Sequence, residues 1–225
     1  MALPADLRKV LDLRWCIYLQ VDMQQRHLDT EVGYHLVPEE HRFRVISNAQ
    51  RCLEAARLAT LPIVHVGTWS RPLSFRGPVD HRNPFWEWQA GKMIIGLNRH
   101  RQTDRNVEGS IYAEFMPELA LLRGEIVVVK RRYSAFYGTD LELVLRGLGA
   151  ETPFICGVNT NNCVLATAFD AFSRDFRVVV VADACGSMNG EDYHRFALME
   201  IETALGFTVS AAEFCELLAK KLSST

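Results

Sequence analysis

The sequence predicts one α/β domain whose doubly wound, mostly parallel sheet carries helices on both faces. Three observations support this: short apolar runs rich in β-branched residues, helical patterns between those runs, and no linker-like segment within 225 residues. Strands covered on both faces form nearly unbroken apolar runs because neither face meets water. A chain of this length can bury a full core by itself, so we expect a single domain over residues 1–225.

Apolar runs and helical patterns alternate along the chain. We interpret as strands residues 15–21, 61–66, 125–129, 153–156 and 177–181, with a short further strand at 207–209. The helical patterns span residues 39–59, 140–148, 163–173, 192–205 and 211–222. Such alternation is typical of βαβ units, in which crossover helices cover a parallel sheet. The aromatic and arginine-rich segment 67–105 breaks the pattern, and we interpret it as a lid or a contact between subunits.

Composition argues against nucleic-acid and membrane partners. The 25 Lys and Arg residues are spread among 27 Asp and Glu residues, which leaves a net charge of −2 and no basic block. No apolar stretch approaches the roughly 20 residues of a membrane span, and the first residues do not resemble a signal peptide. The six cysteines lack paired short spacings, which favours reduced thiols and a cytoplasmic location.

Polar residues that follow the apolar runs are the first candidates for function, because open parallel sheets bind ligands beyond the carboxyl ends of their strands. Asp22 and Lys130 each follow a predicted strand, and Cys163 comes after a short turn. Together they supply a nucleophile, a carboxylate that can transfer its proton, and a cation that stabilises both. Their joint occurrence predicts a catalytic site formed by Asp22, Lys130 and Cys163.

The position of Cys163 suggests an activated thiol. It lies where the apolar run 153–157 gives way to a helical pattern. Backbone N–H groups at a helix start favour negative charge, so we expect the pKa of this thiol to be lowered from about 8.5 towards neutrality. The same N–H groups can hold an oxyanion.

Four segments in a fixed order carry a family resemblance that covers most of the chain. They are residues 21–24, 129–139, 157–164 and 180–185. With these segments the chain resembles the isochorismatase-like cysteine hydrolases, a superfamily that includes nicotinamidases, N-carbamoylsarcosine amidohydrolase, ureidoacrylate amidohydrolases, and biuret and triuret hydrolases. The resemblance implies hydrolysis through a covalent thioester and assembly as a homodimer or homotetramer.

The resemblance also implies roles for individual residues. It assigns catalysis to Asp22, Lys130 and Cys163, and it places a cis peptide bond between Val158 and Asn159. This bond would turn the N–H groups of Asn159 and Cys163 towards one oxyanion.

We further expect four residues to contact substrate. Gln24, Tyr137 and Asn162 can supply hydrogen bonds, and Phe136 is expected by analogy to lie near the pocket wall. The amide of Gln24 can equally hold the turn that follows its own strand.

Departures from the family pattern concern the substrate and the metal. Arg26 and His27 follow the first motif, and they favour anionic or strongly polar substrates. Metal-binding nicotinamidases carry Asp-Trp-His after the second strand, whereas residues 67–70 read Gly-Thr-Trp-Ser here. Without these Asp and His ligands we expect no catalytic metal. We also expect no dinucleotide cofactor, because the Gly-x-Gly at residues 147–149 lies between a helix and a strand.

The sequence therefore predicts a metal-free cysteine hydrolase that cleaves a C–N amide bond. Its expected substrate is a small carbamoyl or ureido compound such as biuret, triuret, ureidoacrylate or an N-carbamoyl amino acid. Two alternatives stay open: an amidase for another small amide, such as maleamate or nicotinamide, and a non-catalytic scaffold protein. The intact set of Asp22, Lys130 and Cys163 argues against the scaffold.

Overall fold

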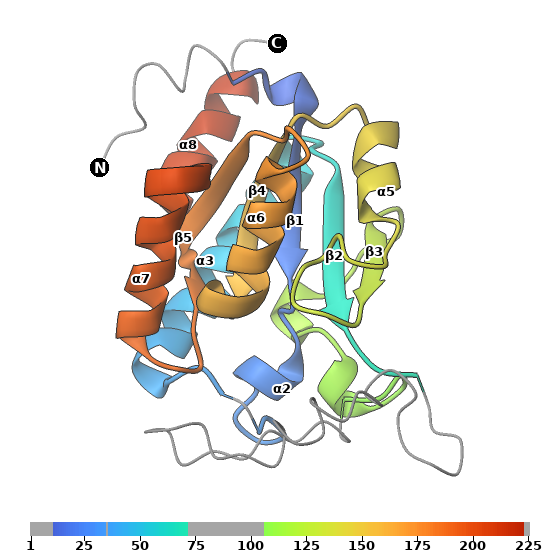
Figure 1. Cartoon of the computed structure of the whole chain (residues 1–225), viewed down its shortest axis with the longest axis vertical. Coiled ribbons are helices and arrows are strands. Elements are labelled where there is room, and N and C mark those ends of the chain that lie inside the picture. Colours follow the sequence, from blue (N-terminus) through green and yellow to red (C-terminus); the bar gives the residue numbers. More distant parts are fainter. Residues whose placement is uncertain (1–10, 35, 72–105, 223–225) are drawn as a thin grey trace.

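The computed structural model describes residues 11–34, 36–71 and 106–222, and these residues form one sheet surrounded by helices (Figure 1). The strands are β1 (Cys16–Val21), β2 (Ile63–Thr68), β3 (Ile126–Lys130), β4 (Thr152–Val158), β5 (Val178–Gly186) and β6 (Gly206–Val209). The α-helices are α2 (Gln25–Leu28), α3 (Glu39–Leu58), α5 (Leu141–Gly147), α6 (Leu165–Phe172), α7 (Glu191–Glu200) and α8 (Ala211–Leu222).

The sheet is parallel throughout, in the order β3-β2-β1-β4-β5-β6. This order confirms the predicted doubly wound fold. The direction of winding reverses between β1 and β4, and the carboxyl ends of these two neighbours meet where Val21 pairs with Gly157. A crevice for a ligand is expected beyond such a switch point.

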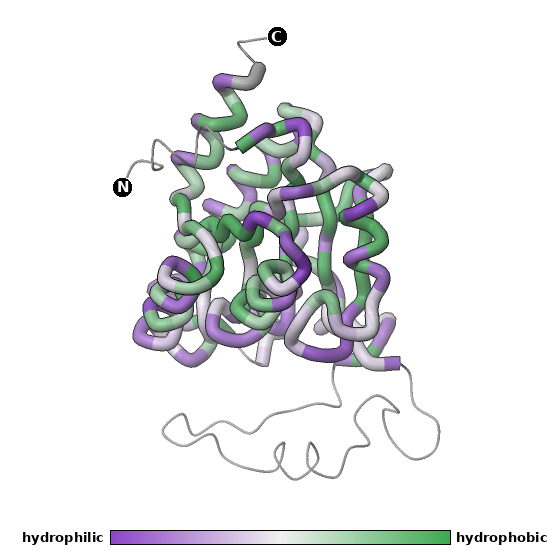
Figure 2. The backbone as a smooth tube through the Cα atoms, turned by 45° about the horizontal axis from the view of Figure 1, so that its top comes forward, coloured by the Kyte–Doolittle hydropathy of each residue, from purple (hydrophilic) through white to green (hydrophobic). Residues whose placement is uncertain are grey.

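Helices lie on both faces of the sheet. In Figure 1, α6 lies in front of the strands and α3 lies behind them, where it also packs against α8. Every residue of β1 and β4 is buried. Figure 2 shows predominantly hydrophobic strands at the centre and hydrophilic segments mostly on outer turns and loops. The unbroken apolar runs of the sequence therefore correspond to strands covered on both faces.

The predicted elements are all present, but several bounds differ. Two helices expected from sequence are shorter, because residues 160–164 and 201–205 form π-helical turns before α6 and after α7. β5 extends through Gly186, five residues beyond its apolar run, because Cys185 and Gly186, which follow the polar Asp183, still pair with β4 after a register shift. Polar residues within a strand hide its end from an analysis of hydrophobicity.

Three further expectations from the sequence concern the cysteines, the segment 67–105 and membrane-spanning helices. All six cysteines are free thiols, as the spacing predicted. Most of the segment 67–105 lies outside the described residues, and its role as a lid or subunit contact stays a prediction. Among the helices of the described chain, none has the length and apolar character that a membrane span requires.

Candidate active site

The end of β1 places Asp22 at the switch point of the sheet. Its backbone has a φ of 52°, in the left-handed region that aspartate tolerates better than most residues. The Asp22 N–H donates to the carbonyl of Val66 at 2.8 Å, which fixes this turn against β2. The side chain is fully buried, and its Oδ1 accepts a hydrogen bond from the Thr68 hydroxyl at 2.7 Å. The carboxylate is therefore held in one orientation.

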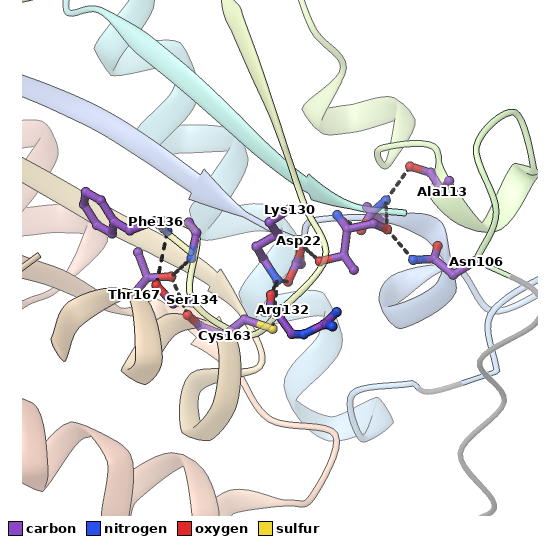
Figure 3. A network of polar contacts seen from close by, with 12 residues as sticks. Asp22, Asn106, Ala113, Lys130, Arg132, Ser134, Phe136, Cys163 and Thr167 are labelled. Atoms are coloured by element: carbon purple, nitrogen blue, oxygen red, sulfur yellow. Dashed lines mark hydrogen bonds and ion pairs between the residues drawn. The ribbon is translucent and has the colours of Figure 1, made fainter. Parts of the chain in front are cut away.

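Lys130, the last residue of β3, connects the candidate catalytic groups (Figure 3). Its Nζ lies 2.7 Å from Oδ2 of Asp22 and 3.3 Å from Sγ of Cys163, and it donates to the carbonyl of Arg132 at 3.0 Å. These three partners match the three donors of an ammonium group. The structure thus brings together all three residues that the sequence singled out.

The ion pair between Asp22 and Lys130 sets the charges of the site. Burial alone would raise the pKa of Asp22, but the charges of Lys130 and Arg26 and hydrogen bonds from Cys163 and Lys130 lower it below its ordinary value. Burial alone would lower the pKa of Lys130, but Asp22 and Cys163 raise it. Both groups are therefore ionised near neutral pH.

The surroundings of Cys163 differ from those that the sequence predicted. It lies within the π-helical turn Thr160–Val164 and not in the first turn of α6. Burial and the neighbouring carboxylate of Asp22 raise its pKa to about 11, which outweighs the opposing effect of Lys130. The expected lowering of this pKa is wrong, because burial and the carboxylate of Asp22 both disfavour the thiolate. The resting site holds a neutral thiol.

The loop that carries Cys163 is tied to its surroundings. The Thr167 hydroxyl donates to the carbonyl of Cys163 at 2.6 Å and accepts from the N–H of Ala135 at 3.0 Å. Ahead of the thiol, the peptide bond between Val158 and Asn159 is cis, as the resemblance implied. The Asn159 side chain accepts a hydrogen bond from the backbone of the loop after β5 at 2.7 Å. An oxyanion hole from the N–H groups of Asn159 and Cys163 stays a prediction.

Gly157 allows the strands to approach each other beside the site. Its φ is 131°, and a Cβ at this position would overlap the backbone carbonyl of Val21. We expect Gly157→Ala to lower the free energy of unfolding by about 2–4 kcal/mol, because it adds both backbone strain and a clash. Gly190→Ala is the matched control, since Gly190 has a φ of 101° but no atom within 4 Å of the added Cβ. Urea unfolding gives the free energy of unfolding of both variants. If Gly157→Ala were as stable as Gly190→Ala, the expected clash with Val21 would be contradicted.

The four expected substrate contacts have different surroundings. The Gln24 amide donates to the carbonyls of Thr68 and Ala113 and accepts from the Thr68 N–H, so it joins the segment after β1 to the end of β2 and to residue 113. The ring of Phe136 is buried beside Phe176 at 5.9 Å between centroids.

Figure 3 shows the Phe136 ring well away from Sγ of Cys163. Tyr137 is exposed, and Asn162 is half-buried without a side-chain hydrogen bond to another described residue. Direct contact of these four residues with substrate stays a prediction.

Thr68 is a further residue of the site, for which the sequence indicated no role. Its hydroxyl orients Asp22, and its carbonyl and N–H receive Gln24. The available signal was its position as a polar residue two places after the second apolar run, which resembles the position of Lys130 directly after the third. Within the described ranges, no three His, Cys, Asp or Glu side chains gather as metal ligands. The expected independence from metal stays a prediction.

Fold and site together define a class: doubly wound α/β proteins with a buried aspartate, lysine and cysteine at the switch point of the sheet. The chain belongs to the isochorismatase family, because the isochorismatase domain model matches residues 16–213.

Relatives and solved structures agree with this family. The chain is 33% identical over 172 residues to a ureidoacrylate amidohydrolase RutB of Methylobacterium radiotolerans, a match covering 76% of this chain and 66% of that relative, slightly less than two thirds of its length. A cysteine hydrolase from Pseudomonas syringae pv. phaseolicola has a TM-score of 0.76 at 22% identity, covering 93% of this chain and 95% of that one. N-carbamoylsarcosine amidase from Thermoplasma acidophilum has a TM-score of 0.65 at 23% identity, covering 87% and 96%. At these identities the two structures support the fold.

Proposed function

We propose that this protein is a metal-independent cysteine hydrolase that cleaves a C–N amide bond of a small carbamoyl or ureido compound. The observation that carries the proposal is the contact of Lys130 Nζ with both the Cys163 thiol and the Asp22 carboxylate. This arrangement supplies a nucleophile and a proton acceptor in a buried site. The ureidoacrylate amidohydrolase among the relatives supports a ureide as the substrate.

The proposed reaction has two stages. Sγ of Cys163 attacks the carbonyl carbon while its proton passes to Asp22, and the N–H groups of Asn159 and Cys163 stabilise the oxyanion. The C–N bond then breaks, and the departing ammonia or amine takes the proton from Asp22. In the second stage Asp22 accepts a proton from water, whose oxygen attacks the thioester carbonyl. The C–S bond breaks, and Sγ takes the proton back from Asp22, which restores the resting thiol and carboxylate.

The raised pKa of Cys163 agrees with this order of events. A thiol with a pKa of about 11 keeps its proton in the resting site, so that the proton is present for the leaving nitrogen. Lys130 lowers the cost of the thiolate as it forms, because its ammonium lies 3.3 Å from Sγ. The proton therefore moves in step with the attack.

Two alternatives define the test. A different small amide, such as maleamate or nicotinamide, would use the same three groups. A scaffold protein would need none of them, which their close packing in a buried site disfavours. Assembly as a homodimer or homotetramer and a cytoplasmic location stay predictions.

The experiment is release of ammonia or amine from a panel of small amides. The panel holds biuret, triuret, ureidoacrylate, N-carbamoyl amino acids, maleamate and nicotinamide, each with wild-type protein before and after chelator treatment. We expect turnover of a ureide that resists the chelator and is lost in Cys163→Ser. Cys52→Ser is the matched control, since Cys52 is a buried thiol of α3 outside the site. Turnover that survives in Cys163→Ser would contradict the mechanism, and chelator-sensitive turnover would contradict metal independence.

A further inference from the structure

Arg26 is a cation beside the candidate active site for which the proposed reaction has no role. It lies in α2, the short helix that follows β1 beyond the carboxyl edge of the sheet (Figure 1). The residue is half-buried, and its buried Nε has no hydrogen-bond partner among the residues that the structure describes. Among the described residues, no carboxylate forms an ion pair with its guanidinium. Buried N–H groups nearly always have an acceptor, so this one requires an explanation.

The charge of Arg26 reaches the catalytic groups. It lowers the pKa of Asp22 and of Cys163, and it opposes the protonation of Lys130. Among the described groups that shift these pKa values most, Lys130 and Arg26 are cations, Asp22 is the carboxylate, and the Cys163 thiol is neutral. The site therefore has an excess of positive charge, which favours an anionic ligand.

We propose that Arg26 binds a carboxylate of the substrate, and this inference rests on the proposed function. A guanidinium offers a planar pair of N–H groups that matches a carboxylate in a bidentate contact. Nε belongs to one such pair, so an incoming carboxylate would satisfy the donor that is now unpaired. A substrate anion would also balance the excess charge.

This assignment divides the candidate substrates. Ureidoacrylate, N-carbamoyl amino acids and maleamate carry a carboxylate, whereas biuret, triuret and nicotinamide do not. Arg26 would thus select ureido or amide acids over neutral ureides of similar size. The amide bond to be cleaved would lie at Cys163 and the carboxylate at Arg26.

A second role for Arg26 has to be separated from this one. The charge of Arg26 could influence the reaction solely by changing the pKa values of Asp22 and Cys163, without any contact with substrate. Such an effect would alter the turnover of neutral and anionic substrates alike. Recognition of a carboxylate would alter only the anionic ones, and mainly through KM.

The kinetic test compares N-carbamoylglycine with its neutral analogue, in which a hydroxymethyl group replaces the carboxylate. We expect Arg26→Gln to lower kcat/KM for the anionic compound by about 10- to 100-fold and for the neutral one by less than about threefold. For the anionic compound, Arg26→Lys should have a kcat/KM between those of wild type and Arg26→Gln, because it keeps the charge but loses the planar pair of donors. Arg51→Gln, an exposed arginine of α3, is the matched control. Equal losses on both compounds, or no loss on either, would overturn the proposal.

A binding measurement keeps this test independent of turnover. In the Cys163→Ser background, calorimetry gives the Kd of N-carbamoylglycine with and without Arg26→Gln. We expect the second substitution to weaken binding by about 10- to 100-fold. Absence of binding, or a Kd that does not change, would overturn the role of Arg26. Failure of the proposed function looks different, because wild-type protein would then bind the acid in the same way but hydrolyse no compound of the panel.

Discussion

Asp22→Asn is expected to lower kcat by about 10²- to 10⁴-fold while making Cys163 easier to alkylate. The amide keeps the size of the carboxylate but can neither accept the thiol proton nor pass it to the leaving nitrogen. At the same time, removal of the negative charge takes away a cause of the raised thiol pKa, while Lys130 continues to favour the thiolate. Loss of turnover and gain of reactivity in one variant would separate proton transfer from nucleophilicity.

The pH dependence of alkylation gives the sign of this effect. In wild-type protein the Cys163 pKa of about 11 means that the rate with iodoacetamide should keep rising well above neutral pH. In Asp22→Asn the same curve should move to lower pH, because the thiolate no longer faces an anion. The measurement follows the Cys163 peptide by mass spectrometry in a Cys215→Ser background. That background is needed because Cys215 is less buried and has a pKa lowered to about 7. If the pH dependence of alkylation were the same in Asp22→Asn as in wild type, the Asp22 carboxylate would not be a cause of the raised Cys163 pKa.

The candidate catalytic residues could be recognised because their signal is local. Asp22 and Lys130 are polar residues at the ends of apolar strands, and a parallel sheet brings such ends to one edge whatever lies between them. The same reasoning predicted the fold, since alternation of buried strands with helices leaves few arrangements. The identity and neighbourhood of the candidate groups therefore followed from pattern alone.

The ionisation of the site could not be predicted in this way. The pKa of Cys163 depends on its burial and on the exact approach of Asp22, and neither is visible in spacing. The π-helical turn is similarly a product of tertiary contacts, among them the hydrogen bond between Thr160 and His194 at 2.8 Å. Arg26 could be noticed as a charge near the entrance, but only the structure shows that its buried Nε lacks a partner in the described part of the chain.

Replacing Lys130 should have the largest effect on stability. Lys130→Met would leave the carboxylate of Asp22 buried and unpaired, since both side chains are almost completely buried. We expect the free energy of unfolding to fall by about 3–5 kcal/mol at neutral pH and turnover to be lost. Without the ammonium, burial should raise the pKa of Asp22 above its unfolded value. The loss of stability should therefore be complete above that raised pKa and shrink as pH falls and the carboxyl group takes up a proton.

The double variant Asp22→Asn with Lys130→Met tests whether this loss comes from the ion pair. With both charges removed, the buried site no longer holds an unpaired ion, and we expect most of the lost stability to return. Turnover should stay absent, because the proton acceptor and the cation beside the thiol are both gone.

Urea unfolding of the wild type, the two single variants and the double variant gives the coupling energy directly. If the double variant were no more stable than Lys130→Met, the stability of this edge of the sheet would depend on the packing of the lysine chain. The expected recovery would instead mean that the Asp22–Lys130 pair contributes little to net stability.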